Sequence, residues 1–313
     1  MGAELNLGWM LGRAARGQKF VPLKLRVNDA LALKSLRRLA PQFQMQARSA
    51  RPVAVGTKVQ IRPEQNGVKL NVGGCLVRIK QSLEKNAGTR RIALAANRSQ
   101  PPITRARLKG INAVIATYST NFDPGNVKRT GNMRLGIKAI NGTLLSPDET
   151  FSLNKTVGER TQARGYRTTI VFENGYKVPG IGGGISQVTG TLFNAALLAG
   201  LPITSYRTHS QPVAYIPIGR DATVAYGSFD MKFKNNRKTP IFISYTLQGD
   251  RVTAQLLGAK TNQKVSLRVI SKKIGPREIK AQLYRTIRQN GKVVAKSKVG
   301  DSHYKWKDSD WMD

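Results

Sequence analysis

Cysteine, histidine and long apolar runs are scarce or missing in this chain of 313 residues. The single cysteine, Cys75, excludes an intramolecular disulfide and argues against a cysteine-based metal site. The only histidines are His209 and His303. No apolar run approaches the ~20 residues that a membrane-spanning helix needs, and charges interrupt the N-terminal region where a signal peptide would be apolar. We therefore expect no metal ion, no cofactor and no transmembrane helix.

Acidic residues are also few, because 17 Asp and Glu stand against 52 Lys and Arg, a net charge of +35. Residues 1–117 carry half of this excess, with 22 basic and 4 acidic residues. Such a charge favours a polyanionic partner: nucleic acid, an anionic membrane surface or an acidic cell-wall polymer. Surface charge also serves solubility, so the charge alone does not choose among these roles.

The most distinctive stretch runs from residue 180 to residue 201 and reads GIGGGISQVTGTLFNAALLAGL. Four of its first five residues are glycine, and Ser186 follows. An apolar set at helical spacing comes next: Val188, Leu192, Ala195, Ala196 and Ala199. A glycine-rich turn before a helix leaves backbone N–H groups exposed at the positive end of the helix dipole. This geometry suits a bound anion, a developing oxyanion or a nucleophile.

Three interpretations of this stretch compete. In the first, Ser186 caps the helix and the glycines permit tight packing. The second, a phosphate-binding loop, is weak because no Gly-Lys-Ser/Thr follows. In the third, Ser186 is a nucleophile, which needs a partner base because an alcohol is weak without one. His209 is the candidate base, although a lone histidine is also typical of a hydrogen-bonded structural residue. His303 lies in the C-terminal tail and is expected to be incidental.

Composition and pattern predict an α+β protein with three parts. Residues 1–100 form a small, very basic α+β module, residues 108–258 an α+β domain with a mixed or antiparallel sheet, and residues 259–313 a strand-rich C-terminal extension. Pro101-Pro102 marks the first boundary. The first module holds no constellation of catalytic residue types. It also begins inside a domain, which is typical of a chain that lacks an upstream segment.

Finer patterns predict local structure within these parts. Alternation predicts strands over residues 20–27, 54–62 and 213–216, and Asn174-Gly175 predicts a hairpin turn. Helical spacing predicts a helix over residues 129–140. We expect two tyrosines, Tyr215 and Tyr226, to pack on the sheet and to line no functional site. Cys75 lies in an apolar run and is expected to be a buried structural residue.

Residues from about 118 to 258 resemble the VanW family through three motifs in order. These are NGTLLSPDETFSLNKTVGERT at 141–161, GGGISQVTGTLFNAALLAGL at 182–201 and HSQPVAYIPIGRDATVAYGSFDMKFKN at 209–235. Residues 1–100 resemble the peptidoglycan-binding-like module that often precedes this domain. The resemblance implies an extracytoplasmic protein of the cell envelope. It also implies a relation to L,D-transpeptidases, because some members are considered to cross-link peptidoglycan stem peptides with a cysteine in a GGGxCQ motif.

This sequence departs from that motif at its nucleophile, where Ser186 occupies the cysteine position. A helix N-terminus lowers the pKa of a thiol enough to give thiolate at neutral pH. An alcohol is not ionised in this way and needs a base at hydrogen-bond distance. Ser186 therefore acts only with a base such as His209, oriented by Asp221. Without that base, the site keeps its shape and loses its chemistry.

Four further residues complete the predicted site. The backbone N–H groups near Gly183 and Gly184 are expected to hold the oxyanion, and Gln187 is expected to contact substrate. Arg220 has two readings: it forms a buried ion pair with Asp221, or it binds a substrate carboxylate bidentately, which suits a peptide stem.

The leading functional hypothesis is a peptidoglycan-associated protein that binds a stem peptide or an anionic wall polymer through a degenerate active site. The alternative is an active L,D-transpeptidase-like acyltransferase that uses Ser186 with His209. A third hypothesis, a basic nucleic-acid-binding protein, is favoured by the charge. However, the sequence shows no aromatic-and-basic RNA motif and no recognition-helix pattern.

Overall fold

The computed structural model describes residues 26–84, 91–173 and 176–306, which fall into two compact units. The first unit comprises the chain up to Arg48 together with Gln65–Pro101, and the second comprises Ser49–Glu64 together with the chain from Pro102 onward. Most of the strand predicted over residues 20–27 and the turn predicted at 174–175 lie outside the described residues. The segment 49–64, which the sequence placed in the basic module, clusters with the second unit.

The first unit is built from two helices and one strand pair. Helix α2 (Asp29–Leu39) begins at Asn28, whose side chain accepts the Leu31 N–H at 3.1 Å. Helix α3 (Val72–Glu84) contacts α2, and β3 (Gly67–Leu70) pairs antiparallel with β4 (Ala96–Ser99). Cys75 is 1% exposed in the small core, and its sulfur bonds to the backbone of Ala95. The expectation of a buried structural cysteine is confirmed.

The second unit contains a six-stranded sheet in the order β1-β2-β5-β13-β12-β6, with all neighbours antiparallel. Its strands are β1 (Arg51–Val55), β2 (Lys58–Arg62), β5 (Ala113–Asn121), β13 (Arg251–Gly258), β12 (Ile241–Gln248) and β6 (Leu144–Leu145). The single strand expected over residues 54–62 is therefore wrong. The chain reverses at Gly56, whose φ of 61° is a left-handed conformation that glycine adopts without strain.

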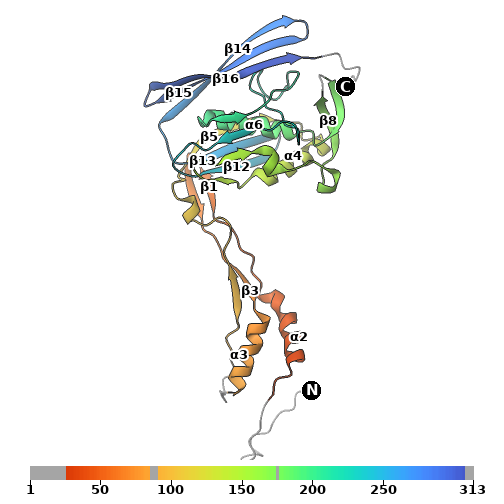
Figure 1. The fold of residues 1–313 in the computed structure, drawn as a ribbon, viewed down its shortest axis with the longest axis vertical. Coiled ribbons are helices and arrows are strands. Elements are labelled where there is room, and N and C mark those ends of the chain that lie inside the picture. The colour runs from red at the N-terminus through yellow and green to blue at the C-terminus, as the bar shows by residue number, and fades with distance from the viewer. Residues whose placement is uncertain (1–25, 85–90, 174–175, 307–313) are drawn as a thin grey trace, which may run out of the picture. The chain divides into compact units, whose positions relative to one another are not determined.

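Helix α6 (Ile185–Leu198) occupies the centre of this unit. It packs on β5 and β13, while α4 (Val127–Ile140) lies beside it and also contacts β12 (Figure 1). Every residue of α6 except Ser186 and Leu198 is buried. The main core surrounds it, with Leu192, Phe193 and Leu197 at 0% exposure. The helix expected over residues 129–140 is confirmed by α4.

Three smaller strand groups complete the second unit. They are the sheet of β10 (Ile203–Ser205), β11 (Lys232–Lys234) and β7 (Thr150–Ser152); the hairpin of β8 (Thr168–Glu173) and β9 (Tyr176–Ile181); and the C-terminal sheet of β14 (Gln263–Gly275), β15 (Glu278–Gln289) and β16 (Lys292–Lys305). Strand β14 contacts α6, so the C-terminal strands belong to the same packed structure. The predicted α+β class is confirmed.

The strand expected over residues 213–216 is not formed. This segment lies in the long connection between β10 and β11 and consists of turns. Pro212 and Pro217 bracket it, and proline donates no ladder hydrogen bond, so pairing with a neighbouring strand is disfavoured on both sides. Among the described residues, no helix has both the length and the apolar character needed to cross a membrane.

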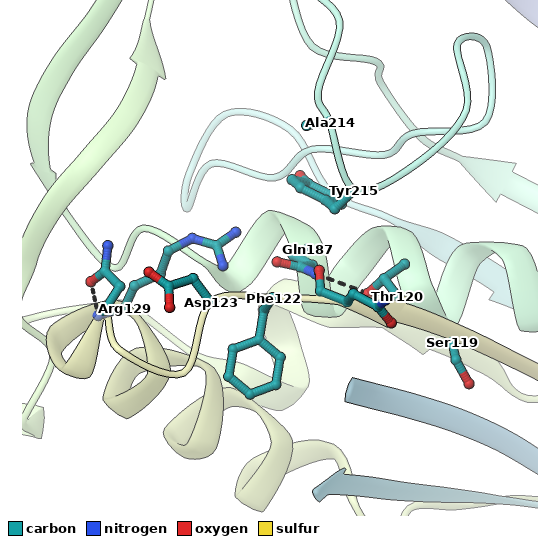
Figure 2. A pocket seen from close by; sticks show the side chains of 10 residues that line it. Ser119, Thr120, Phe122, Asp123, Arg129, Gln187, Ala214 and Tyr215 are labelled. Carbon is teal, nitrogen blue, oxygen red and sulfur yellow. Dashed lines mark hydrogen bonds between the residues drawn. The ribbon is translucent and has the colours of Figure 1, made fainter. Parts of the chain in front are cut away.

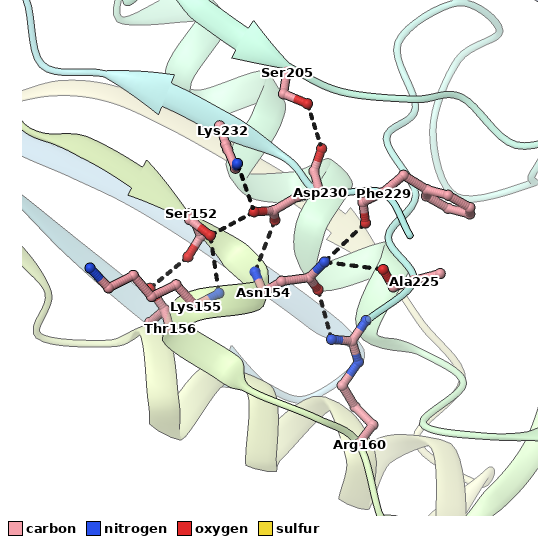
Figure 3. A network of polar contacts seen from close by, with 10 residues as sticks. All are labelled: Ser152, Asn154, Lys155, Thr156, Arg160, Ser205, Ala225, Phe229, Asp230 and Lys232. Carbon is pink, nitrogen blue, oxygen red and sulfur yellow. Dashed lines mark hydrogen bonds and ion pairs between the residues drawn. The ribbon is translucent and has the colours of Figure 1, made fainter. Parts of the chain in front are cut away.

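A polar network joins the start of α5 (Leu153–Val157) to the segment before β11 (Figure 3). The Asp230 carboxylate accepts from the Ser152 hydroxyl at 2.6 Å and from the Asn154 backbone N–H at 2.9 Å. The Asn154 amide donates to two carbonyls of the same loop, and Arg160 donates to its oxygen at 2.7 Å. The network formed by Ser152, Asn154 and Asp230 therefore has a structural role, because it ties the start of α5 to the segment before β11.

We expect Asp230→Asn to lower the free energy of unfolding of the second unit by about 1–3 kcal/mol, because one buried donor loses its acceptor. Asp148→Asn is the matched control, since Asp148 also pairs with a lysine but its side chain is 81% exposed. That exposed pair should contribute less than about 1 kcal/mol. Calorimetry of both variants measures the difference. Equal losses for the two would contradict the structural role of the Asp230 network.

Candidate functional site

The glycine turn before α6 is shaped by two close neighbours. A Cβ at Gly183 would stand 2.1 Å from Thr169 Oγ1, a contact that no real side chain tolerates. Gly184 has a φ of 101°, and a Cβ there would lie 3.0 Å from Arg129 Cγ. The glycines thus let β8 and α4 approach the turn. Gly184 is also the N-cap, with no side-chain cap, so the interpretation of Ser186 as the capping residue is wrong.

Ser186 lies at the open end of α6, half-buried, with its Oγ 3.0 Å from Thr223 Oγ1. Within the described residues, the backbone N–H groups of Gly183, Gly184 and Ser186 donate no hydrogen bond. The N-terminal end of the helix therefore presents unpaired donors beside the serine hydroxyl, where partial positive charge accumulates. This matches the arrangement expected for an oxyanion-binding turn.

His209 and Asp221 form a buried pair, 5% and 2% exposed. One carboxylate oxygen of Asp221 accepts from both the His209 backbone N–H and ring Nδ1, each at 2.7 Å. In the tautomer that carries its ring proton on Nδ1, this nitrogen donates to Asp221 and Nε2 is an acceptor. Phe172 of β8 packs edge-on to the imidazole, with ring centroids 5.7 Å apart. The expectation that Asp221 orients His209 fits this geometry.

The other oxygen of Asp221 accepts from the hydroxyl of Tyr304, and that hydroxyl accepts the Gly219 N–H at 2.7 Å. Tyr304 is fully buried in β16, and burial together with the Asp221 charge raises the pKa of its phenol. Sequence reasoning missed this residue, because nothing in the C-terminal extension indicated a contact with the site. Its neighbour His303 bonds instead to Glu278 in a more exposed position.

Thr223 links Ser186 to the His209–Asp221 pair. The Thr223 N–H donates to the carbonyl of Arg207 at 2.8 Å, so the segments 207–209 and 221–223 run side by side. Residues two apart on an extended chain lie about 7 Å apart and on the same face. Ser186 therefore contacts the position next to the pair. Within the described residues, however, no hydrogen bond joins Ser186 Oγ to the His209 ring.

Arg220 points away from Asp221. Its Nε donates to Asn194 Oδ1 at 2.8 Å, and its guanidinium carbon lies 5.1 Å from the centre of the Tyr118 ring. No ion pair with Asp221 exists among the described side chains, so that reading of the adjacent Arg and Asp is wrong. The other reading, a carboxylate-binding Arg220, stays a prediction.

An open pocket of about 760 Å³ lies beside the first turn of α6 (Figure 2). The end of β5, the start of α4, Gln187 and Tyr215 line it. Gln187 Nε2 donates to Thr120 Oγ1 at 3.0 Å and to the Asn121 carbonyl at 2.6 Å. Tyr215, expected to pack on a sheet, instead forms one wall. Sequence reasoning also missed Arg129, whose functional signal was hidden in an ordinary helical pattern.

Two ionisable side chains that line this pocket, Arg129 and Tyr215, are desolvated by burial. Burial lowers the pKa of the Arg129 guanidinium and raises the pKa of the Tyr215 phenol, because each charged form loses hydration. Arg129 lies over the Tyr215 ring, 5.8 Å from its centre. Tyr226 is 54% exposed beneath Arg160 and lines no part of the pocket. In the described part of the chain, no cluster of His, Cys, Asp and Glu is arranged to bind a metal ion.

Residues 128–257 match the family model described as VanW like protein. The uncharacterized protein YoaR of Bacillus subtilis (strain 168) is 43% identical over 129 residues, which cover 41% of this chain and 43% of that protein. The vancomycin B-type resistance protein VanW of Enterococcus faecalis (strain ATCC 700802 / V583) is 27% identical over 158 residues, 49% of this chain and 58% of that protein. The chain thus spans about half the length of these curated relatives. No solved structure matches it.

We expect Tyr304→Phe to destabilise the second unit by about 1–3 kcal/mol, because it leaves the Gly219 N–H and one Asp221 oxygen buried without a partner. Tyr284→Phe on the neighbouring strand is the control. Its hydroxyl donates only to the Gln282 side chain in a less buried setting, so we expect a change within about 0.5 kcal/mol. Thermal unfolding measures both. Indistinguishable melting temperatures would refute the idea that β16 supports the His209–Asp221 pair.

Proposed function

From the premise that residues 128–257 form a VanW-like domain, we propose that the protein associates with peptidoglycan in the cell envelope and binds its stem peptides at the pocket beside Ser186. Three features support this. The VanW resemblance implies a cell-wall setting. The net charge of +35 suits a polymer that carries anionic groups. The pocket is large enough for a small ligand, and its lining includes Gln187, the residue that follows Ser186 on α6.

One observation favours binding over catalysis, namely the hydrogen bond between Ser186 Oγ and Thr223 Oγ1. A threonine hydroxyl does not take a proton from serine at neutral pH, so no base among the described residues is hydrogen-bonded to Ser186 Oγ. A cysteine at the same position would be activated by the helix N-terminus without such a base. The site therefore retains its anion-binding turn while its nucleophile is weak.

Acyl transfer is the second candidate, because the His209–Asp221 pair lies two residues along from the Arg207–Thr223 bridge. In that reaction Ser186 Oγ forms a bond to the stem-peptide carbonyl carbon while His209 Nε2 takes its proton. The N–H groups of Gly183 and Gly184 hold the oxyanion. The C–N bond then breaks, and His209 returns the proton to the leaving amine. A second amine displaces Ser186 from the acyl group. This route requires the Ser186 side chain to turn from Thr223 toward His209.

We expect a cross-linked dimer from disaccharide-tetrapeptide only with the variant Ser186→Cys, because the thiol is ionised by the helix N-terminus and the alcohol is not. Mass spectrometry of the products measures this for the natural protein, Ser186→Cys and Ser186→Ala. Isothermal titration should show that the natural protein and Ser186→Ala bind the fragment with similar affinity.

Two results would change this conclusion. Dimer from the natural protein that vanishes in Ser186→Ala would establish the serine acyltransferase. Absence of both dimer and binding in all three proteins would remove the peptidoglycan proposal, and salt-dependent binding to duplex DNA would then revive the nucleic-acid hypothesis.

A further inference from the structure

We propose that Arg129 and Gln187 form a subsite for the C-terminal end of a short peptide. The Arg129 guanidinium binds the free carboxylate, and the Gln187 side-chain oxygen accepts the N–H of the same terminal residue. The inference rests on the proposed function only in taking that peptide from peptidoglycan. The sequence pointed to Arg220 for the carboxylate and gave Arg129 no role, and it expected Gln187 to contact substrate without naming the group that Gln187 binds.

The orientation of the Gln187 amide is determined by its partners. Its nitrogen faces the Asn121 carbonyl at 2.6 Å, which is only an acceptor, so the amide cannot be flipped. Its oxygen is then buried without a hydrogen-bond partner, in a residue that is 1% exposed. A buried unpaired acceptor is costly, and such groups are rare in folded proteins. A ligand N–H that enters the pocket would satisfy it.

The Arg129 guanidinium is the second group in the pocket that lacks a strong hydrogen-bond partner in the described part of the chain. The Arg129 backbone N–H is capped by the Asn126 side chain at 3.1 Å, which anchors the residue in the first turn of α4. Its guanidinium donates only to Met133 Sδ at 3.5 Å and forms no ion pair within 4.0 Å among the described residues, although the nearby Asp123 carboxylate favours its charged form. A partly desolvated arginine with free donors suits a planar, bidentate acceptor such as a carboxylate.

The two groups face one pocket and lie next to Ser186. Figure 2 shows the Arg129 guanidinium and the Gln187 amide on the same side of the Tyr215 ring. Gly184 lies against Arg129 Cγ, and Gln187 follows Ser186 on the first turn of α6. A peptide end bound here therefore lies at the first turn of α6, although Ser186 and Thr223 are not among the residues that line the pocket. The Tyr215 ring supplies a flat wall against a small side chain.

The Gln187 oxygen needs a hydrogen-bond donor and the Arg129 guanidinium needs an anionic acceptor. Together these two requirements select the chemical class of the ligand. A phosphate or a polyanionic polymer offers acceptors to Arg129 but no N–H to Gln187. A terminal amino-acid residue with an acylated nitrogen offers both groups within a few bonds of each other. Asp123 also lines the pocket, with one oxygen accepting the Gly125 N–H at 2.8 Å, and its charge disfavours a dianion more than a monoanion.

The test compares N-acetyl-alanyl-alanine with its C-terminal carboxamide, using the full chain and isothermal titration. We expect the free acid to bind at least about tenfold more tightly, since the carboxamide loses a charge-assisted pair with Arg129. Arg129→Gln should remove this preference. Arg134→Gln is the matched control, because Arg134 is an exposed residue of the same helix outside the pocket and its loss should leave the preference intact.

Equal binding of acid and carboxamide by the natural protein would overturn the inference without recourse to any variant. So would an acid preference that persists in Arg129→Gln. A thermal melt of each variant confirms that the fold is retained. Repeating the comparison with disaccharide-tetrapeptide and its carboxamide separates the two proposals. Dipeptide binding that needs Arg129, without fragment binding, removes the peptidoglycan source and keeps the subsite. Fragment binding that ignores the carboxylate removes the subsite and keeps the peptidoglycan proposal.

Discussion

The burial of α6 on nearly every side is the constraint on which the second unit depends. A helix in that position exposes no face to water, so each polar side chain on it needs an internal partner. The Thr189 and Thr191 hydroxyls bond to carbonyls one turn earlier, and Asn194 exchanges hydrogen bonds with Arg220. Tyr245 donates to the Val188 carbonyl from the sheet. Among the described residues, the polar groups of α6 that lack a hydrogen-bond partner lie at its N-terminal turn. They are the backbone N–H groups around Ser186 and the side-chain oxygen of Gln187.

The same constraint assembles the site from distant parts of the chain. Surrounding α6 closely requires glycine where neighbours approach it, and a Cβ at Gly190 would stand 2.5 Å from Ile216 Cδ1. The connection between β10 and β11 is thus held over the helix, and this connection places Thr223 against Ser186 and Asp221 against His209. Tyr304 then anchors this connection from the C-terminal sheet through Asp221 and Gly219. The contacts that bury α6 in the core are therefore also the contacts that position the site residues.

Sequence reasoning was strongest where a signal is local. Helical periodicity and the glycine run predicted α4 and α6. The hydrogen bond between His209 and Asp221 is present, while a contact of Ser186 with that pair stays a prediction. Sequence reasoning failed where the role of a residue depends on a contact with a residue far away in the sequence. Thr223, Tyr304 and Arg129 have ordinary local patterns, and their roles arise only when segments far apart in sequence meet. The strand expected over residues 54–62 failed for a different reason, because alternation continues through a hairpin and only the backbone of Gly56 reveals the turn.

The unmet groups at the α6 turn are the same whether position 186 holds a serine or a cysteine. Its binding features are the unpaired N–H groups, the Gln187 oxygen and the Arg129 guanidinium, and none of them depends on the atom at position 186. A serine in that place lowers nucleophilicity while it keeps nearly the same volume and a hydrogen-bonding hydroxyl. If the proposed function holds, binding at this turn and catalysis at this turn are separable properties. Recognition would then be built from the burial of α6, whereas nucleophilic attack would depend on the single side chain at position 186.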